Sequence, residues 1–463
     1  MKEANAGNAL AEHELGLRYI LGQGVIADTV KAAYWLHKAA EQKLPGACYN
    51  YGILLNNGWG VQWNPFEAYK YFLEAAHNDM PQAEYLIGLS YIDNLIVKRN
   101  WSEAFKWIKR SAKSDFKPAV STLNELRKNV TLSKIDTALN DDQSDQNSNN
   151  NSASENQTSL GNSSGLVFID FSTVGDTVSN VSNQMLIDDL LHEGNNELAQ
   201  VMHLSERNDT TLTFDSAAVK MLTKFAESGS PEALTIMGKL YELGAAHFPI
   251  DLTKASVYYI RAIRFDSPRA PVLLWKMIKD KNYFIQLKKQ IDQNDPQAMF
   301  VWYGLFSIGL DMQLTEADAV NLLKKSAALN YLPALNELGL DLYTGKYFKQ
   351  DRDKAIEVWQ AAKNLGSYEA SIRISIAKIY GYLKIPDYNP AIEEIRKAVK
   401  DGSVLAQTTL AYCYKNGIVL DVSEAEAVKY YRFAAQRGSR FAFDELKQMY
   451  NAIRPSDKIF DVN

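Results

Sequence analysis

Apolar and small residues recur among polar ones along this chain in a pattern that repeats every 36 residues. The first copy holds small residues at five slots, which are Ala11, Gly16, Gly22, Ala32 and Ala39. The same slots in the second copy hold Ala47, Gly52, Gly58, Ala68 and Ala75. The pattern continues over 83–111 and returns over 334–434. A fixed period in this range indicates supersecondary units that stack on one another.

Each unit is predicted to contain two helices. Residues 9–21 carry apolar side chains on a broad helical stripe, formed by Leu10, Leu15, Leu17, Tyr19 and Ile20. Gly22 ends this helix, because glycine adopts the left-handed conformation that closes a last turn, and Asn94 replaces it in the third copy. A second helix is predicted over 31–40.

The glycine in the middle of the first helix predicts close packing between helices. Glycine costs about 1 kcal/mol relative to alanine inside a helix, so its recurrence needs an offsetting gain. It recurs at Gly16, Gly52, Gly88, Gly238 and Gly339. We expect the aromatic slot three residues after the first alanine to lie over this bare backbone. That slot holds Trp35, Tyr71, Trp107, Tyr258 and Tyr430.

The complete pattern resembles the Sel-one-like repeat (SLR) family, a branch of the tetratricopeptide (TPR-like) clan. The residues that match its motif are Ala11, Gly16, Tyr19, Gly22, Gly24, Val25, Lys31, Ala32, Trp35, Ala39 and Ala40. The resemblance covers nearly the whole chain apart from one insertion. It implies an all-α fold, a right-handed α/α superhelical solenoid, here with about ten helix-turn-helix repeats. Since packing residues define the family, the resemblance specifies the fold better than the function.

The chain divides into three predicted regions. Residues 1–136 hold repeats one to three and the first helix of the fourth, and 214–463 hold the later repeats and a closing helix at 439–452. Between them, 137–213 is expected to be a largely disordered insertion inside the fourth repeat, with a candidate helix at 185–204. Its part 137–164 is rich in Asn, Ser, Asp and Gln and cannot bury enough apolar surface to order itself.

Charge and cysteine usage restrict the class of partner and compartment. The net charge of −5 with interspersed acids and bases gives no basic face of the kind that nucleic-acid binders use. Cys48 and Cys413 lie in distant repeats, so no disulfide framework is expected, which favours a reducing compartment. No signal peptide and no membrane span is visible. We therefore expect a cytoplasmic protein, or a periplasmic or secreted one if a leader has been removed.

No constellation of residues predicts catalysis. The six histidines show neither an HExxH motif nor Cys/His ligand spacing, so no metal site is expected. Gly22-Gln23-Gly24 follows a helix and repeats with the fold, which indicates a turn and not a nucleotide-binding loop. The sequence predicts no catalytic residue, no cofactor and no enzymatic activity.

Recognition of another molecule is the expected role, and three candidate surfaces remain open. The concave face of the first helices would carry Tyr49, Asn56, Asn57, Tyr85, Asp93, Thr408, Lys415 and Asn416. The loop between the helices of the second repeat adds Trp59 and Trp63, since tryptophans are typical interface anchors. Trp59 could instead fold back onto the neighbouring turn. The insertion is the third surface, either as a tether or latch over the groove or as a spacer.

The predicted function is that of a non-catalytic scaffold or adaptor that binds a protein or peptide on the concave face of the solenoid. The family resemblance implies a wide range of such roles, from bacterial signalling and host interaction to eukaryotic quality control. The alternative is a repeat protein that binds cell-wall polysaccharide or is associated with a hydrolase, since loop aromatics such as Trp59 would suit a sugar. Self-assembly through the ends of the solenoid is a further alternative.

Overall fold

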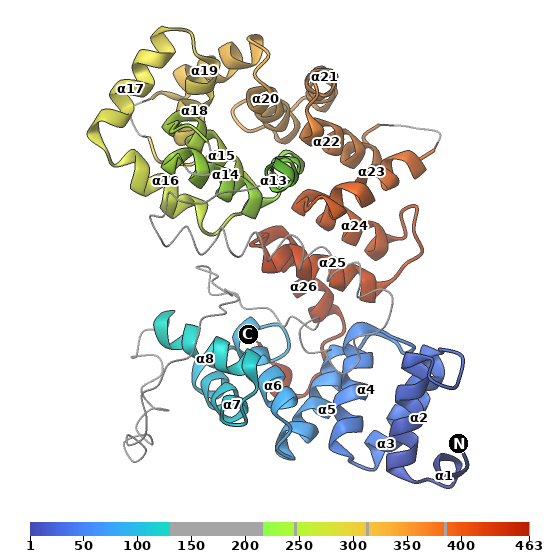
Figure 1. Ribbon diagram of the computed structural model, residues 1–463. Coiled ribbons are helices and arrows are strands. Elements are labelled where there is room, and N and C mark those ends of the chain that lie inside the picture. The colour runs from blue at the N-terminus through green and yellow to red at the C-terminus, as the bar shows by residue number, and fades with distance from the viewer. Residues whose placement is uncertain (130–215, 245–247, 312–313, 384–386, 463) are drawn as a thin grey trace, which may run out of the picture. The chain divides into compact units, whose positions relative to one another are not determined.

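The computed structural model describes residues 1–129, 216–244, 248–311, 314–383 and 387–462 (Figure 1). Its regular elements within these ranges are helices, with no strand among them, which confirms the all-α prediction. They form two compact units, the first from 1–129, 424–432 and 443–462 and the second from 216–423 and 433–442. The predicted insertion at 137–213, with its candidate helix at 185–204, lies outside the described residues.

The first unit begins with a short helix and continues with helices of equal length. They are α1 (Lys2–Asn5), α2 (Ala9–Leu21), α3 (Thr29–Glu41), α4 (Pro45–Asn57), α5 (Pro65–His77), α6 (Pro81–Asp93), α7 (Trp101–Lys113) and α8 (Lys117–Asn129). Residues 424–432 of α25 (Glu424–Gln436), most of α26 (Arg440–Ala452) and the 3₁₀ turn η4 (Lys458–Phe460) complete this unit.

The second unit contains the remaining described helices. They are α13 (Ser216–Ser228), α14 (Pro231–Leu243), α15 (Leu252–Arg264), α16 (Ala270–Ile278), α17 (Lys281–Asp292), α18 (Pro296–Ser307), α19 (Glu316–Ala328), α20 (Leu332–Thr344), α21 (Arg352–Asn364), α22 (Tyr368–Ile379), α23 (Asn389–Lys400) and α24 (Val404–Asn416). The ends of α25 and α26 that meet at residues 433–442 also belong to it.

Within each unit, neighbouring helices pack in the order of the repeat. Both helices of a copy contact each other, as α2 contacts α3 and α20 contacts α21. The second helix then contacts the first helix of the next copy, as α3 contacts α4 and α21 contacts α22. The pair α16 and α17 lies between α15 and α18 in the chain, and α15 contacts both α16 and α18. The 36-residue period therefore corresponds to stacked helix pairs.

The mid-helix glycines permit the close helix approach that the period predicts. A Cβ on Gly52 would lie 2.6 Å from Phe72, and one on Gly339 would lie 2.3 Å from Trp359 Nε1. One detail of the prediction was wrong, because the side chain over the glycine stands four residues after the alanine and not three. In the first copy it is Leu36, and the half-buried Trp35 occupies the predicted slot. The reason is geometric, since a helix turns by about 100° per residue.

The predicted helix ends are confirmed by backbone conformation. Gly22 and Gly58 are left-handed, with φ of 66° and 65°, and Asn94 takes the same conformation at 60°. The second helices begin at polar caps, because Asp28 and Asn64 accept hydrogen bonds from backbone N–H groups three residues on. Local sequence thus specifies where the helices of these repeats begin and end.

The two helices assigned to the fourth copy fall in different units. α8 packs on α7 in the first unit, whereas α13 packs on α14 and α22 in the second. The assignment of α8 and α13 to one repeat, and the three domain bounds that depend on it, stay predictions.

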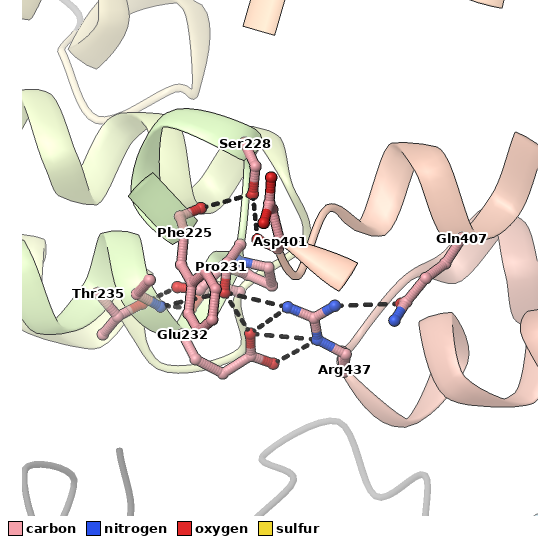
Figure 2. A network of polar contacts seen from close by, with 11 residues as sticks. Phe225, Ser228, Pro231, Glu232, Thr235, Asp401, Gln407 and Arg437 are labelled. Carbon is pink, nitrogen blue, oxygen red and sulfur yellow. Dashed lines mark hydrogen bonds and ion pairs between the residues drawn. The ribbon is translucent and has the colours of Figure 1, made fainter. Parts of the chain in front are cut away.

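In the second unit, the first described helices contact the last ones through a polar network (Figure 2). Arg437 donates to both carboxylate oxygens of Glu232, with a shortest distance of 2.6 Å, and to Gln407 Oε1 at 3.1 Å. Beside this pair, the Ser228 hydroxyl donates to the carbonyl of Asp401. Residues more than 170 positions apart in the chain therefore close this unit on itself.

A second polar cluster joins α15, α18, α20 and α22 inside the same unit. Glu369 accepts from Arg261 at 3.1 Å and from Arg373 at 2.9 Å, and both arginines are largely buried. Tyr303 donates to Asp341, whose pKa is raised to about 7 by burial and by the nearby Glu337. These contacts join four helices of the second unit through largely buried charges.

Candidate functional site

The described part of the chain carries no arrangement that suggests catalysis. Within it, no group of three or more His, Cys, Asp or Glu side chains could hold a metal ion. Both cysteines are buried and unpaired with each other, and burial raises the pKa of Cys48 to about 11 and that of Cys413 to about 12. A thiol with such a pKa is a poor nucleophile at neutral pH. Among the described helices, none has the length and apolar content needed to cross a bilayer.

The residues predicted to bind a partner in the first unit are mostly packed inside it. Tyr49 lies against Phe72, and the Tyr85 hydroxyl contacts Thr122 Oγ1 at 3.0 Å. Asn56 is buried as well. Asn57 is half-buried and donates its amide to the carbonyl of Ile53, one turn back in α4. These side chains therefore contribute to the packing or to the end of their own helix.

The three predicted residues of the second unit lie on α24. Thr408 is buried and donates to the carbonyl of Leu405 at 2.9 Å. Lys415 is half-buried, and Asn416 is exposed with its amide bonded to the carbonyl of Tyr412. Lys415 and Asn416 thus stay accessible to a partner, and their role is still a prediction.

The two loop tryptophans have different environments. Trp63 is buried, and its ring meets that of Tyr450 edge to face at 5.2 Å. Trp59 remains 38% exposed. Its neighbour Gly60 lies directly against the start of α3, next to Val30, which is 65% exposed. Trp59 therefore remains partly accessible, whereas Trp63 contacts a helix from the far end of the sequence.

The contact at Trp63 leads to the site that best fits recognition. Residues 453–462, here called the docked segment, follow α26 and lie across α5 and the loop between α6 and α7. We call the first-unit residues that receive it the recognition surface, and these are Phe66, Tyr69, Lys70, Leu95 and Ile96.

Arg454 is the first anchor of the docked segment. Its guanidinium donates to the carbonyls of Leu95 at 2.7 Å and Ile96 at 3.1 Å, and it stacks 5.1 Å from the ring centre of Phe66. Further bonds go to the Asn451 side chain and to the carbonyl of Phe460. All five N–H donors of arginine are therefore used, which fixes the side chain in one orientation.

Phe460 is the second anchor and is completely buried. Its ring meets Phe66 at 5.0 Å and Tyr69 at 5.9 Å, both edge to face, which is the favoured geometry for aromatic pairs. Full burial of a phenylalanine side chain contributes about 1.5–3 kcal/mol. Between the anchors, Asp457 pairs with Lys70 at 2.9 Å, but both are more than half exposed, so this contact adds at most about 1 kcal/mol.

The loop that receives Arg454 is held in position by its own polar contacts. Asp93, at the end of α6, accepts from the N–H of Leu95 at 2.9 Å, and Arg99 donates to the carbonyl of Ile92 at 2.8 Å. Burial raises the pKa of Asp93 to about 7, against the opposing effects of this N–H and of the arginines Arg432, Arg99 and Arg454. Asp93, which was predicted to lie on the concave face, therefore helps to hold the loop that receives Arg454.

The loop that receives Arg454 departs from the repeat in its sequence. The first copy has Gly22-Gln23-Gly24-Val25 between its helices, whereas the third has Asn94-Leu95-Ile96-Val97. Two apolar side chains thus replace a polar residue and a glycine in a loop, and both are buried in the structure. The departure from the repeat indicates that something covers this loop, although it does not identify the cover.

Comparison with known families gives the identity of the repeat. The Sel1 repeat model matches residues 9–44, 45–80, 81–116, 231–264, 332–367 and 404–439. These ranges coincide with α2–α3, α4–α5, α6–α7, α14–α15, α20–α21 and α24–α25.

Two curated proteins are similar to part of this chain. The chain is 34% identical over 122 residues to human "Protein sel-1 homolog 2" and 35% identical over 91 residues to the mouse protein of that name. The human match spans 26% of this chain and only 18% of the relative, and the mouse match spans 20% and 13%.

Two crystal structures align along almost the whole chain at low similarity. One is a protective antigen of uropathogenic Escherichia coli displaying an SLR fold, with 20% identity, a TM-score of 0.33 and coverage of 98% of this chain and 90% of that one. The other is a Sel1 repeat protein from Oxalobacter formigenes, with 17% identity, a TM-score of 0.27 and coverage of 97% and 88%. On the six matched repeats and the helix pairs that they form, the chain belongs to the Sel1-repeat (SLR) family.

Proposed function

We infer that this protein is a non-catalytic scaffold that binds a protein or peptide partner through its first unit. Sel1-repeat proteins are generally protein-interaction scaffolds and typically lack catalysis. The observation that carries the proposal is that α5 and the α6–α7 loop already hold a chain segment by two anchors. Arg454 is bound by loop carbonyls and Phe460 lies between aromatic rings.

We favour the recognition surface over the predicted concave face because most of the predicted concave residues of the first unit are not accessible to a partner. Tyr49, Tyr85 and Asn56 are buried, so a partner could reach them only after the unit had opened. The concave-face proposal is kept for Lys415 and Asn416, which are accessible.

The function is tested by affinity capture from a native lysate with identification of the captured proteins. The site variant is Lys70→Glu, which reverses an exposed charge beside the docked segment without removing a core side chain. The matched control is Lys113→Glu, an exposed lysine at the end of α7 in the same unit. A third variant, Lys415→Glu with Asn416→Ala, tests the concave face.

A specific protein captured by wild type and Lys113→Glu, but lost with Lys70→Glu, is the expected result. Loss with the Lys415→Glu/Asn416→Ala variant alone would move the site to the concave face. If no protein is captured, retention on glycan or peptidoglycan beads should be measured next, because the Trp59 ring remains partly exposed. Retention there would contradict the scaffold proposal.

A further inference from the structure

We propose that the recognition surface binds peptides of one chemical type, and that the docked segment is its intramolecular occupant, which a partner displaces. The peptide type has an arginine, an acidic residue three positions later and an aromatic residue six positions later. Arg454, Asp457 and Phe460 are these positions in the chain itself. This inference rests on the proposed scaffold function and specifies its ligand.

The contacts of the docked segment are those of a short linear motif. Its anchors Arg454 and Phe460 turn inward, whereas the four residues between Pro455 and Phe460 are exposed. Binding through two anchors and an exposed spacer depends on a few side chains and not on a continuous core. Any chain with the same anchors at the same spacing can make the same contacts.

The receiving groups belong to the repeats themselves and are preformed. Phe66 and Tyr69 lie on α5, whose position is set by its packing on α4 and α6. The carbonyls of Leu95 and Ile96 point at Arg454 from a loop that Asp93 and Arg99 hold in place. A preformed surface loses little conformational freedom on binding, which favours recognition of a short peptide.

Two open cavities lie at the two ends of the docked segment and give room for a longer ligand. One, of about 540 Å³, is bordered by Pro455 and by α3 and α5, with the carboxylates Glu41, Glu67 and Glu74. Lys70 and Lys43, the lysines that line it, pair with Asp457 and with Glu74 respectively. This acidic balance favours a basic residue in the ligand at the position that Pro455 holds, directly after the arginine.

The second cavity, of about 400 Å³, lies beside Lys458, Ile459 and Asp461. Lys98 and Arg99 line its other wall. This wall favours an acidic residue after the aromatic anchor, which is the position that Asp461 holds in the docked segment. A partner has to outcompete an attached segment, which acts at an effective concentration in the millimolar range, and the open volume of the two cavities gives room for the additional contacts.

The test uses the full-length chain and a fluorescently labelled synthetic peptide with the sequence of residues 451–462, followed by anisotropy. The Phe460→Ala chain should bind this peptide at least tenfold more tightly than wild type, because its own segment competes less well. The same peptide carrying Phe460→Ala should not bind. Since loss of Phe460 removes a buried ring, an Asp457→Lys chain, altered only at an exposed pair, should show a smaller increase of a few fold.

A charge swap locates the binding site. Introducing Lys70→Asp into the Phe460→Ala chain should lower its affinity for the peptide. A peptide that carries Asp457→Lys should bind this doubly substituted chain with restored affinity. Lys113→Asp in the same background is the matched control and should leave the affinity unchanged. Circular dichroism melts establish that each variant remains folded.

Several results would overturn the inference. Failure of the peptide to bind the folded Phe460→Ala and Asp457→Lys chains would exclude the motif, and indifference to Lys70→Asp would exclude the site. A concentration-dependent dimer that the peptide blocks would assign the surface to a second copy instead of a separate partner. Capture of a protein partner together with absence of peptide binding would refute this inference alone and leave the scaffold function standing.

Discussion

The ion pair between Arg437 and Glu232 is expected to stabilise the second unit, and its removal is a quantitative test of how that unit closes. The perturbation is Arg437→Gln, which keeps much of the side chain and removes the charge. In the structure, this guanidinium also bonds to Ser230 and Gln407, so it joins α14, α24 and the segment after α25 (Figure 2).

The magnitude follows from burial. Removing one partner of a fully buried ion pair costs about 3–5 kcal/mol, since the other charge is left without compensation. The side chains of Arg437 and Glu232 are 18% and 25% exposed, so water replaces part of the interaction. We therefore expect a loss of about 2 kcal/mol in the free energy of unfolding. For a unit of this size, this loss corresponds to a decrease of about 4–8 °C in Tm.

The assay is a double-mutant cycle with Glu232→Gln, read by urea unfolding and by hydrogen exchange of the amides in α14 and α24. A coupling energy of about 1 kcal/mol or more is expected, with faster exchange in both helices. Single variants that lose less than about 0.5 kcal/mol each, with additive effects in the double variant, would refute the reasoning. In that case the closure depends on apolar packing alone.

The pH dependence of the free energy of unfolding tests the same ion pair independently. Burial of Glu232 acts to raise its pKa, but Arg437 outweighs this effect and holds the pKa below its usual value. A carboxylate with a depressed folded-state pKa contributes stability above its unfolded pKa of about 4.3 and loses it as the pH falls through the folded value. The wild-type advantage over Arg437→Gln should therefore decrease below about pH 4.

Three further outcomes are expected. Gly339→Ala should lower the free energy of unfolding by about 1–2 kcal/mol, because the new Cβ would lie 2.3 Å from Trp359 Nε1. Gly46→Ala is the matched control, since its Cβ would meet only His13 at 3.4 Å, and it should show no loss of stability in urea melts. Asp93, with a pKa raised to about 7, binds its proton more tightly in the folded state than in the unfolded state. The free energy of unfolding should therefore fall as the pH rises from 4 to 7, by up to about 1.4 kcal/mol per pH unit. Asp93→Asn should flatten this dependence in melts recorded at several pH values. Cys48, with its pKa near 11 and no exposed surface, should react with a disulfide reagent at pH 8 only as urea unfolds the chain, and reaction at the rate of a free thiol would contradict the packing around it.

Much of the fold could be predicted because each helix pair is specified locally. The left-handed turns at Gly22 and Gly58, the polar caps that open the second helices and the buried glycine slots all follow from residues within one copy. Contacts between neighbouring copies repeat with the same period, so one correct copy predicts the next. Even the error at Trp35 was a shift of a single helical position.

The candidate site could be predicted only in part. Trp63 was predicted to anchor an interface with another molecule, whereas the structure buries it against Tyr450 of the same chain. Nothing in the residues around Trp63 points to a helix 387 positions later. Leu95 and Ile96 stood out only as departures from the repeat, and Phe460 lies outside the repeat altogether. An apolar side chain can be recognised as one that must be covered, whereas the group that covers it depends on where distant parts of the chain come together.

Periodicity along the chain thus specifies the helices, their turns and the stacking of neighbouring copies, since these depend on contacts between residues up to about one period apart. Folding in three dimensions decides which surfaces remain for a partner. The closure at Arg437 and Glu232 and the docking of Arg454 and Phe460 each join residues more than 200 positions apart. Such contacts arise from small rotations summed over several repeats, and no single copy of the motif records that sum.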